Sequence, residues 1–169
     1  MRFLFFILSL ALFPLTSQAG EDAFSTGPVF KDFGPVADVT TTMAIEPGTV
    51  IKHSFDVAEP GADGEPNRTL VSAARFINMH ARAEVPVDNI QIAVVVHGKA
   101  SMEMADEDGA SADLIAALTE HGVRIIVCGQ SAAYYDVATE DLLPGVEMAL
   151  SAMTAHALLQ QQGYTINPF

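Results

Sequence analysis

The chain has 169 residues, a formal net charge of −13 and a hydrophobic share of 50%. Its 21 Asp and Glu residues outnumber its 8 Lys and Arg residues, which argues against nucleic-acid binding because phosphate recognition needs a basic surface. The single cysteine excludes an internal disulfide, and the length fits one domain with a substantial core.

The first 19 residues have the pattern of a secretory signal peptide. Arg2 supplies positive charge, residues 3–15 are almost wholly apolar, and small residues follow near Ala19. We expect cleavage after Ala19, a periplasmic or secreted protein, and no membrane association after cleavage. A retained anchor is the alternative, although the apolar run is short for a membrane span.

Residues 20–48 are rich in turn-forming Gly and Pro and show no clear periodicity, which predicts an extended strap. Phe30 and Phe33 are costly to expose, so we expect the strap to pack on the domain or on a neighbouring subunit.

Residues 49–169 are predicted to form one α/β domain. Runs rich in apolar and β-branched residues predict strands at 49–58, 90–96, 123–128, 146–150 and 164–167. Helices are predicted at 67–83, from 111 to about 121, within 132–143 and at 151–162, with Asn67, Ser111 and Ser151 as N-caps. Residues 101–111 are predicted to be an acidic loop. The alternation of strands and helices predicts a parallel sheet with helices on both faces.

The only cysteine, Cys128, ends the strand predicted at 123–128. Gly129 permits a sharp turn there, and Ser131 is a candidate cap for the helix that follows. His97 ends the preceding strand, so both side chains are expected at the carboxyl edge of the sheet, where α/β proteins bind ligands. Backbone N–H groups at a helix start favour the thiolate, which is the reactive form of cysteine.

Several further residues are candidates for binding at this edge. Gly98 and Lys99 follow the histidine, and the backbone N–H groups of Gln130 and Ser131 are suited to bind an anion. Asn78 is a candidate on the first predicted helix. Two of these residues have a structural alternative: the lysine is solvated, and the asparagine ties down a loop.

The two candidate catalytic residues also have structural alternatives. Cys128 can be a small buried hydrophobic residue without chemistry. His97 can stabilise the thiolate or act as a general base, or it can hold a turn by bonding to a loop carbonyl.

We expect no metal and no cofactor. Cys128 with His97, and with His53 or His80, lacks the short ligand spacings of zinc sites. The glycine-rich phosphate-binding patterns and the Gly-x-Ser-x-Gly pattern of hydrolases are also missing from the sequence.

A set of short segments, in this order and spacing, resembles the secreted branch of the DsrE/DsrF-like sulfur-relay family. The segments are Phe-Ile-Asn-Met-His at 76–80, Ala-Val-Val-Val-His-Gly at 93–98, Val-Cys-Gly-Gln-Ser at 127–131, Ala-Leu-Ser-Ala-Met-Thr at 149–154 and the stretch 159–168. The Gly-Pro turns of the strap also resemble that branch.

The resemblance implies a flavodoxin-like, three-layer α/β/α sandwich with a mostly parallel sheet of about five strands. It also implies a homo-oligomer (dimer, trimer or hexamer) and a persulfide-carrying cysteine, for which Cys128 is the matching position. On this basis we expect a sulfur carrier or sulfurtransferase-like protein. Its partner would be a sulfur donor or acceptor protein, or a small sulfane-sulfur compound. The alternative is a non-catalytic oligomeric binding or assembly module in which the cysteine is structural.

Overall fold

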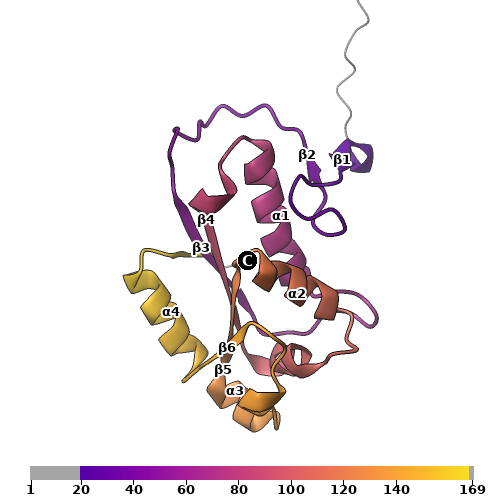
Figure 1. Ribbon diagram of the computed structural model, residues 1–169, viewed down its shortest axis with the longest axis vertical. Coiled ribbons are helices and arrows are strands. Elements are labelled where there is room, and N and C mark those ends of the chain that lie inside the picture. Colours follow the sequence, from indigo (N-terminus) through magenta and orange to yellow (C-terminus); the bar gives the residue numbers. More distant parts are fainter. Residues whose placement is uncertain (1–19, 168–169) are drawn as a thin grey trace, which may run out of the picture.

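The computed structural model describes residues 20–167 (Figure 1). The predicted signal peptide lies outside these residues. The helices are α1 (Arg68–Arg82), α2 (Ala112–Glu120), α3 (Gly129–Tyr134) and α4 (Ala152–Gln161). The strands are β1 (Phe24–Ser25), β2 (Val36–Ala37), β3 (Ile51–Val57), β4 (Ile90–Val96), β5 (Arg124–Cys128), β6 (Val146–Ala149) and β7 (Thr165–Asn167). Four short 3-10 helices, η1 (Glu21–Ala23), η2 (Val87–Asn89), η3 (Gly98–Ala105) and η4 (Thr139–Asp141), complete the described elements.

The centre of the domain is a five-stranded sheet in the order β6-β5-β4-β3-β7. Every neighbouring pair in it is parallel, so the predicted parallel sheet is confirmed. The last strand, β7, crosses to the far edge and pairs with β3. The three-layer, flavodoxin-like α/β architecture is also confirmed: in Figure 1, α1 and α2 lie on one side of the strands and α4 lies on the other.

The two faces of the sheet are covered unequally. The larger core lies under α1 and α2 and receives the odd residues of β3 and β5 and the even residues of β4, such as Phe55, Val94 and Ile125. The opposite residues, including Val95 and Ile126, pack with Ala155 and Leu159 of α4 in a much smaller core. This alternation follows from the two-residue period of a strand.

All three predicted helix starts are right, but only two of the predicted capping hydrogen bonds form. Asn67 accepts a hydrogen bond from Thr69 N–H, and Ser151 accepts one from Thr154 N–H, as N-caps do. Ser111 occupies the N-cap position of α2, but its side chain makes no capping hydrogen bond, because its hydroxyl accepts one from Asn67 N–H at 3.0 Å. The region predicted as an acidic loop at 101–111 begins inside the 3-10 helix η3 instead.

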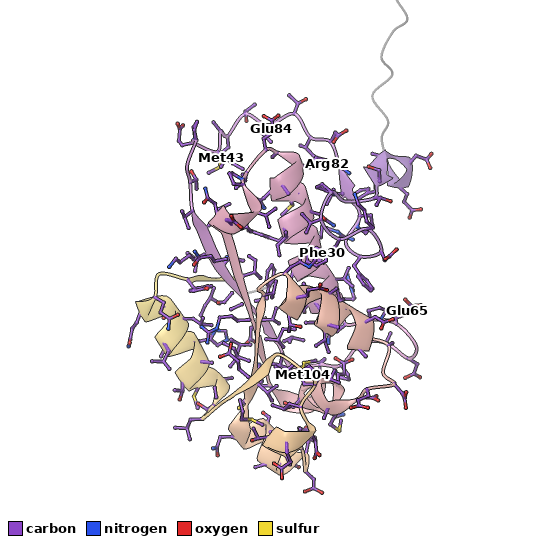
Figure 2. All side chains as sticks on the ribbon, viewed as in Figure 1. Phe30, Met43, Glu65, Arg82, Glu84 and Met104 are labelled. Atoms are coloured by element: carbon purple, nitrogen blue, oxygen red, sulfur yellow. The ribbon has the colours of Figure 1, made fainter. Side chains whose placement is uncertain are left out.

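The strap packs on its own domain. Its β1 and β2 form a short antiparallel pair beside α1 (Figure 1). Phe30 is 3% exposed and joins the larger core, with its ring 4.7 Å from that of His121. Figure 2 shows Phe30 between the strap and the helices, and Arg82 close to the strap at the end of α1. Arg82 donates hydrogen bonds to the carbonyls of Val36 and Thr26.

Within residues 20–167, no helix combines the length and the apolar character needed to cross a membrane.

Candidate functional site

The sheet register brings three chemically active side chains to one edge and one face. Val96 pairs with Val127, so the residues that follow, His97 and Cys128, leave their strands side by side. Asp56 pairs with Val95, one residue before the end of β3. By strand alternation all three lie on the α4 face. Adjacent strands therefore deliver a thiol, an imidazole and a carboxylate to the same place.

Cys128 is the N-cap of α3 and is 6% exposed. Burial raises the pKa of its thiol, but hydrogen bonds from the Ser131 hydroxyl and from the backbone N–H groups of Ser131, Ala152 and Gln130 more than offset this effect. The net pKa lies below the usual value. Donors from two helix starts, α3 and α4, thus favour the thiolate.

Ser131 does not cap α3, contrary to the sequence prediction, because it lies inside the helix. Its hydroxyl oxygen accepts a hydrogen bond from Gly98 N–H at 3.0 Å and so is oriented to donate toward the thiol. Gly98 has a φ of +56°, and a Cβ there would lie 2.7 Å from the carbonyl oxygen of Ala58. Glycine is therefore required where the chain turns past β3.

Asp56 holds two histidines from different elements. Its Oδ2 lies 2.9 Å from Nε2 of His97, and its Oδ1 lies 2.7 Å from Nε2 of His156 on α4. Burial raises the pKa of the Asp56 carboxyl. Hydrogen bonds from His156 and His97 lower this pKa by more than burial raises it, so the net pKa lies below its ordinary value. The carboxylate is therefore charged at neutral pH.

The thiol, the carboxylate and both imidazoles line one cavity of about 320 Å³. It is lined by side chains from the ends of β3, β4 and β5 and from the starts of α3 and α4: Asp56, His97, Cys128, Gln130, Ser131, Ser151, Ala152, Met153 and His156. In the part of the chain that the structure describes, no group of three or more His, Cys, Asp and Glu side chains is arranged to hold a metal ion.

Of the residues predicted from sequence, four line this cavity: Cys128, His97, Gln130 and Ser131. Gly129 lies behind the cysteine, where a Cβ would be 2.7 Å from the carbonyl oxygen of Ala149, so it permits close packing of α3 on β6. Lys99 is exposed and lies outside the cavity lining.

Asn78 is not at this site, and its placement among the site residues needs correction. It is 0% exposed on α1, where its Oδ1 accepts from Val29 N–H and Phe30 N–H. Its amide nitrogen donates to the carbonyls of Phe30, Phe33 and Gly34. This is the structural alternative, in which the asparagine ties down a neighbouring segment. The physical reason is that its helix packs on the face of the sheet opposite α4.

Sequence reasoning missed Asp56 and His156. Asp56 is the acidic residue within an otherwise β-forming run at 49–58, and a charge in such a run is a signal in itself. His156 lies in the last helix beside the core residue Ala155. The two residues are 100 positions apart, so only the fold pairs them.

The fold and the cavity together define a small α/β protein with a single thiol at the carboxyl edge of a parallel sheet. The model of the DsrE/DsrF-like family matches residues 52–168, and the chain belongs to this family.

Two solved structures share the fold. One is described as a protein of unknown function, MTH1491, from Methanobacterium thermoautotrophicum; it has 20% sequence identity and a TM-score of 0.56, over 69% of this chain and 97% of that one. The other is the ychN protein from E. coli, with 14% identity and a TM-score of 0.52, over 69% of this chain and 99% of that one. No curated protein sequence matches the chain.

Proposed function

We propose that this protein is an exported sulfur carrier that accepts sulfane sulfur on Cys128 and holds it as a persulfide. Membership of the DsrE/DsrF-like family supports a role of the sulfur-relay type. Export is supported by the signal-peptide pattern of residues 1–19. A homo-oligomer is supported by large apolar side chains that are exposed at the end of α3, before α4 and on α4: Tyr134, Leu150 and Met153.

The observation that carries the proposal is the setting of the thiol. Cys128 lines a cavity, and hydrogen bonds from four groups hold its pKa below the usual value. A thiolate is the species that attacks a sulfane sulfur. The residue is 6% exposed, and the cavity that it lines is its route to a small reagent.

The reaction needs no cofactor. The thiolate attacks the outer sulfur of a donor R–S–SH, a new S–S bond forms at Cys128, and the donor's S–S bond breaks with the electron pair leaving on R–S⁻. Thiosulfate reacts in the same way, and sulfite is then the leaving group. The persulfide passes to an acceptor thiolate by the same step in reverse.

The test is sulfur loading followed by intact mass measurement. Incubating the purified protein with inorganic polysulfide or thiosulfate should add the mass of one sulfur atom, and dithiothreitol should remove it. Cys128→Ser should abolish the gain. No gain in the wild type, or an equal gain in the variant, would overturn the proposal.

Alkylation of the native protein distinguishes the structural alternative. For a carrier, iodoacetamide should label Cys128 in the folded state at neutral pH. Labelling only under unfolding conditions would instead favour a buried structural cysteine in a non-catalytic oligomeric module.

A further inference from the structure

Asp56, His97 and His156 form a cluster of hydrogen-bonded titratable side chains that lines the same cavity as the thiol. One carboxylate uses both oxygens to hold two imidazoles, at 2.9 and 2.7 Å. The two histidines come from the end of β4 and from α4, and both line the cavity that contains the Cys128 thiol.

The carboxylate determines where each imidazole carries its proton. An ionised carboxylate only accepts hydrogen bonds, so each Nε2 must be the protonated nitrogen. In the neutral form of each ring, Nδ1 is then an unprotonated base. Asp56 thereby leaves Nδ1 as the basic nitrogen of two histidines that line one cavity.

The second histidine has an unused acceptor. His156 Nδ1 is buried and has no hydrogen-bond partner among the described residues. Leaving a buried acceptor unpaired costs about 1–3 kcal/mol, so its retention calls for a use. Protonation of this nitrogen would satisfy it and give an imidazolium paired with Asp56.

The other ionisable groups near the cluster are few. The titratable side chains lining the cavity are Asp56 from β3, His97 after β4, Cys128 from β5 and His156 from α4, and α3 contributes none. Lys99 follows His97 in sequence but is exposed and does not line the cavity. The thiol is the proton source that lies within the cavity itself.

We propose that Asp56, His97 and His156 form a proton-accepting relay for Cys128, with Asp56 as the positioning residue and the two Nδ1 atoms as the bases. This inference rests on the proposed sulfur-carrier function. To that function it adds the residue His156 and the step in which the thiol proton is accepted. The thiol proton moves to an Nδ1, which leaves a thiolate and an imidazolium. After attack on R–S–SH the imidazolium returns this proton to R–S⁻, so the net reaction of Cys128–SH with R–S–SH yields the Cys128 persulfide and R–SH.

Two possible roles of Asp56, a positioning residue for the bases or only a nearby negative charge, predict opposite effects of the substitution Asp56→Asn. If Asp56 is only a nearby negative charge, removing that charge makes the thiolate easier to form. If Asp56 positions the bases, Asp56→Asn makes the thiolate harder to form. The amide nitrogen donates to one Nε2, and that ring then carries its proton on Nδ1 and is no longer a base there.

The experiment is the pH profile of iodoacetamide alkylation of the full protein. In Asp56→Asn the profile should move to higher pH, with a rate at pH 7 about tenfold below wild type and an unchanged plateau at high pH. His156→Gln keeps an amide donor for Asp56 and removes the basic Nδ1, so it should shift the profile in the same direction. His121→Gln, on the opposite side of the sheet, is the matched control and should match wild type.

The outcomes separate this inference from the function itself. A profile that is unshifted or moves to lower pH in Asp56→Asn overturns the relay, and an unshifted profile in His156→Gln removes that residue from it. Sulfur loading of both variants at alkaline pH should equal wild type, because the thiol ionises there without a base. If the wild type does not load sulfur at any pH, the carrier function fails, whatever the alkylation profiles show.

Discussion

Asn78 on α1 and His156 on α4 are polar side chains that lie on opposite faces of one sheet. Asn78 is 0% exposed and has five hydrogen bonds, all to the backbone of the strap. His156 has a side chain 16% exposed and one hydrogen bond, to Asp56, while its other nitrogen has no partner among residues 20–167. Full pairing is typical of a structural anchor, and the incomplete pairing of His156 beside a cavity is the observation on which its proposed role rests.

The two faces of the sheet differ in the same way as Asn78 and His156 do. The face under α1 and α2 carries the larger core and the strap, and the buried Asn78 on it is fully hydrogen-bonded to the strap backbone. The face under α4 has a small core and leaves space for a cavity of about 320 Å³ at the carboxyl edge. Stability should therefore depend mainly on the first face and thiol chemistry on the second.

The largest effect on stability is expected at the strap anchor. Asn78→Ala leaves the backbone N–H groups of Val29 and Phe30 without their acceptor, so it should lower the free energy of unfolding by about 3 kcal/mol. Urea denaturation measures this change. Ser72→Ala, on the same helix, removes only an exposed hydrogen bond to the carbonyl of Arg68 and is the matched control. The alkylation rate of Cys128 should stay unchanged, and a large fall in that rate would contradict the division between the faces.

A smaller effect, now on chemistry, is expected at Ser131. Ser131→Ala removes a hydrogen bond that favours the thiolate, so the pKa of Cys128 should rise and native alkylation at neutral pH should slow several-fold. Gly98 N–H also loses its acceptor, which should cost about 1 kcal/mol of stability. The alkylation pH profile and urea denaturation together measure both changes. An unaltered thiol pKa would show that the backbone donors alone stabilise the thiolate.

The smallest effect is expected in the acid dependence of stability. The two histidines hold the pKa of Asp56 below its unfolded value of 3.8, although burial acts in the opposite direction. The resulting stabilisation is present above that value and is lost as the pH falls through the lower, folded pKa. Unfolding measured between pH 5 and pH 2 should show less acid destabilisation in Asp56→Asn than in wild type. Equal slopes for both proteins would contradict this assignment.

Local patterns in the sequence were sufficient for most of the fold. The run at 90–96 is β4 as predicted, and Asn67 and Ser151 begin helices as their cap chemistry indicates. The prediction that Cys128 and His97 meet at one edge is also confirmed by the cavity lining. These features depend on residues close in sequence and on the rule that parallel strands end together.

The tertiary structure decided which polar groups became partners. Ser111 and Ser131 have the chemistry of caps, but their hydroxyls accept from Asn67 and Gly98, residues that only folding brings near. Local sequence patterns were enough to predict a parallel sheet, the position of the lone thiol and the resemblance to the DsrE/DsrF-like family. The pairing of Asp56 with His156, 100 residues away, required the packed fold, because a hydrogen bond depends on distances that no local pattern encodes.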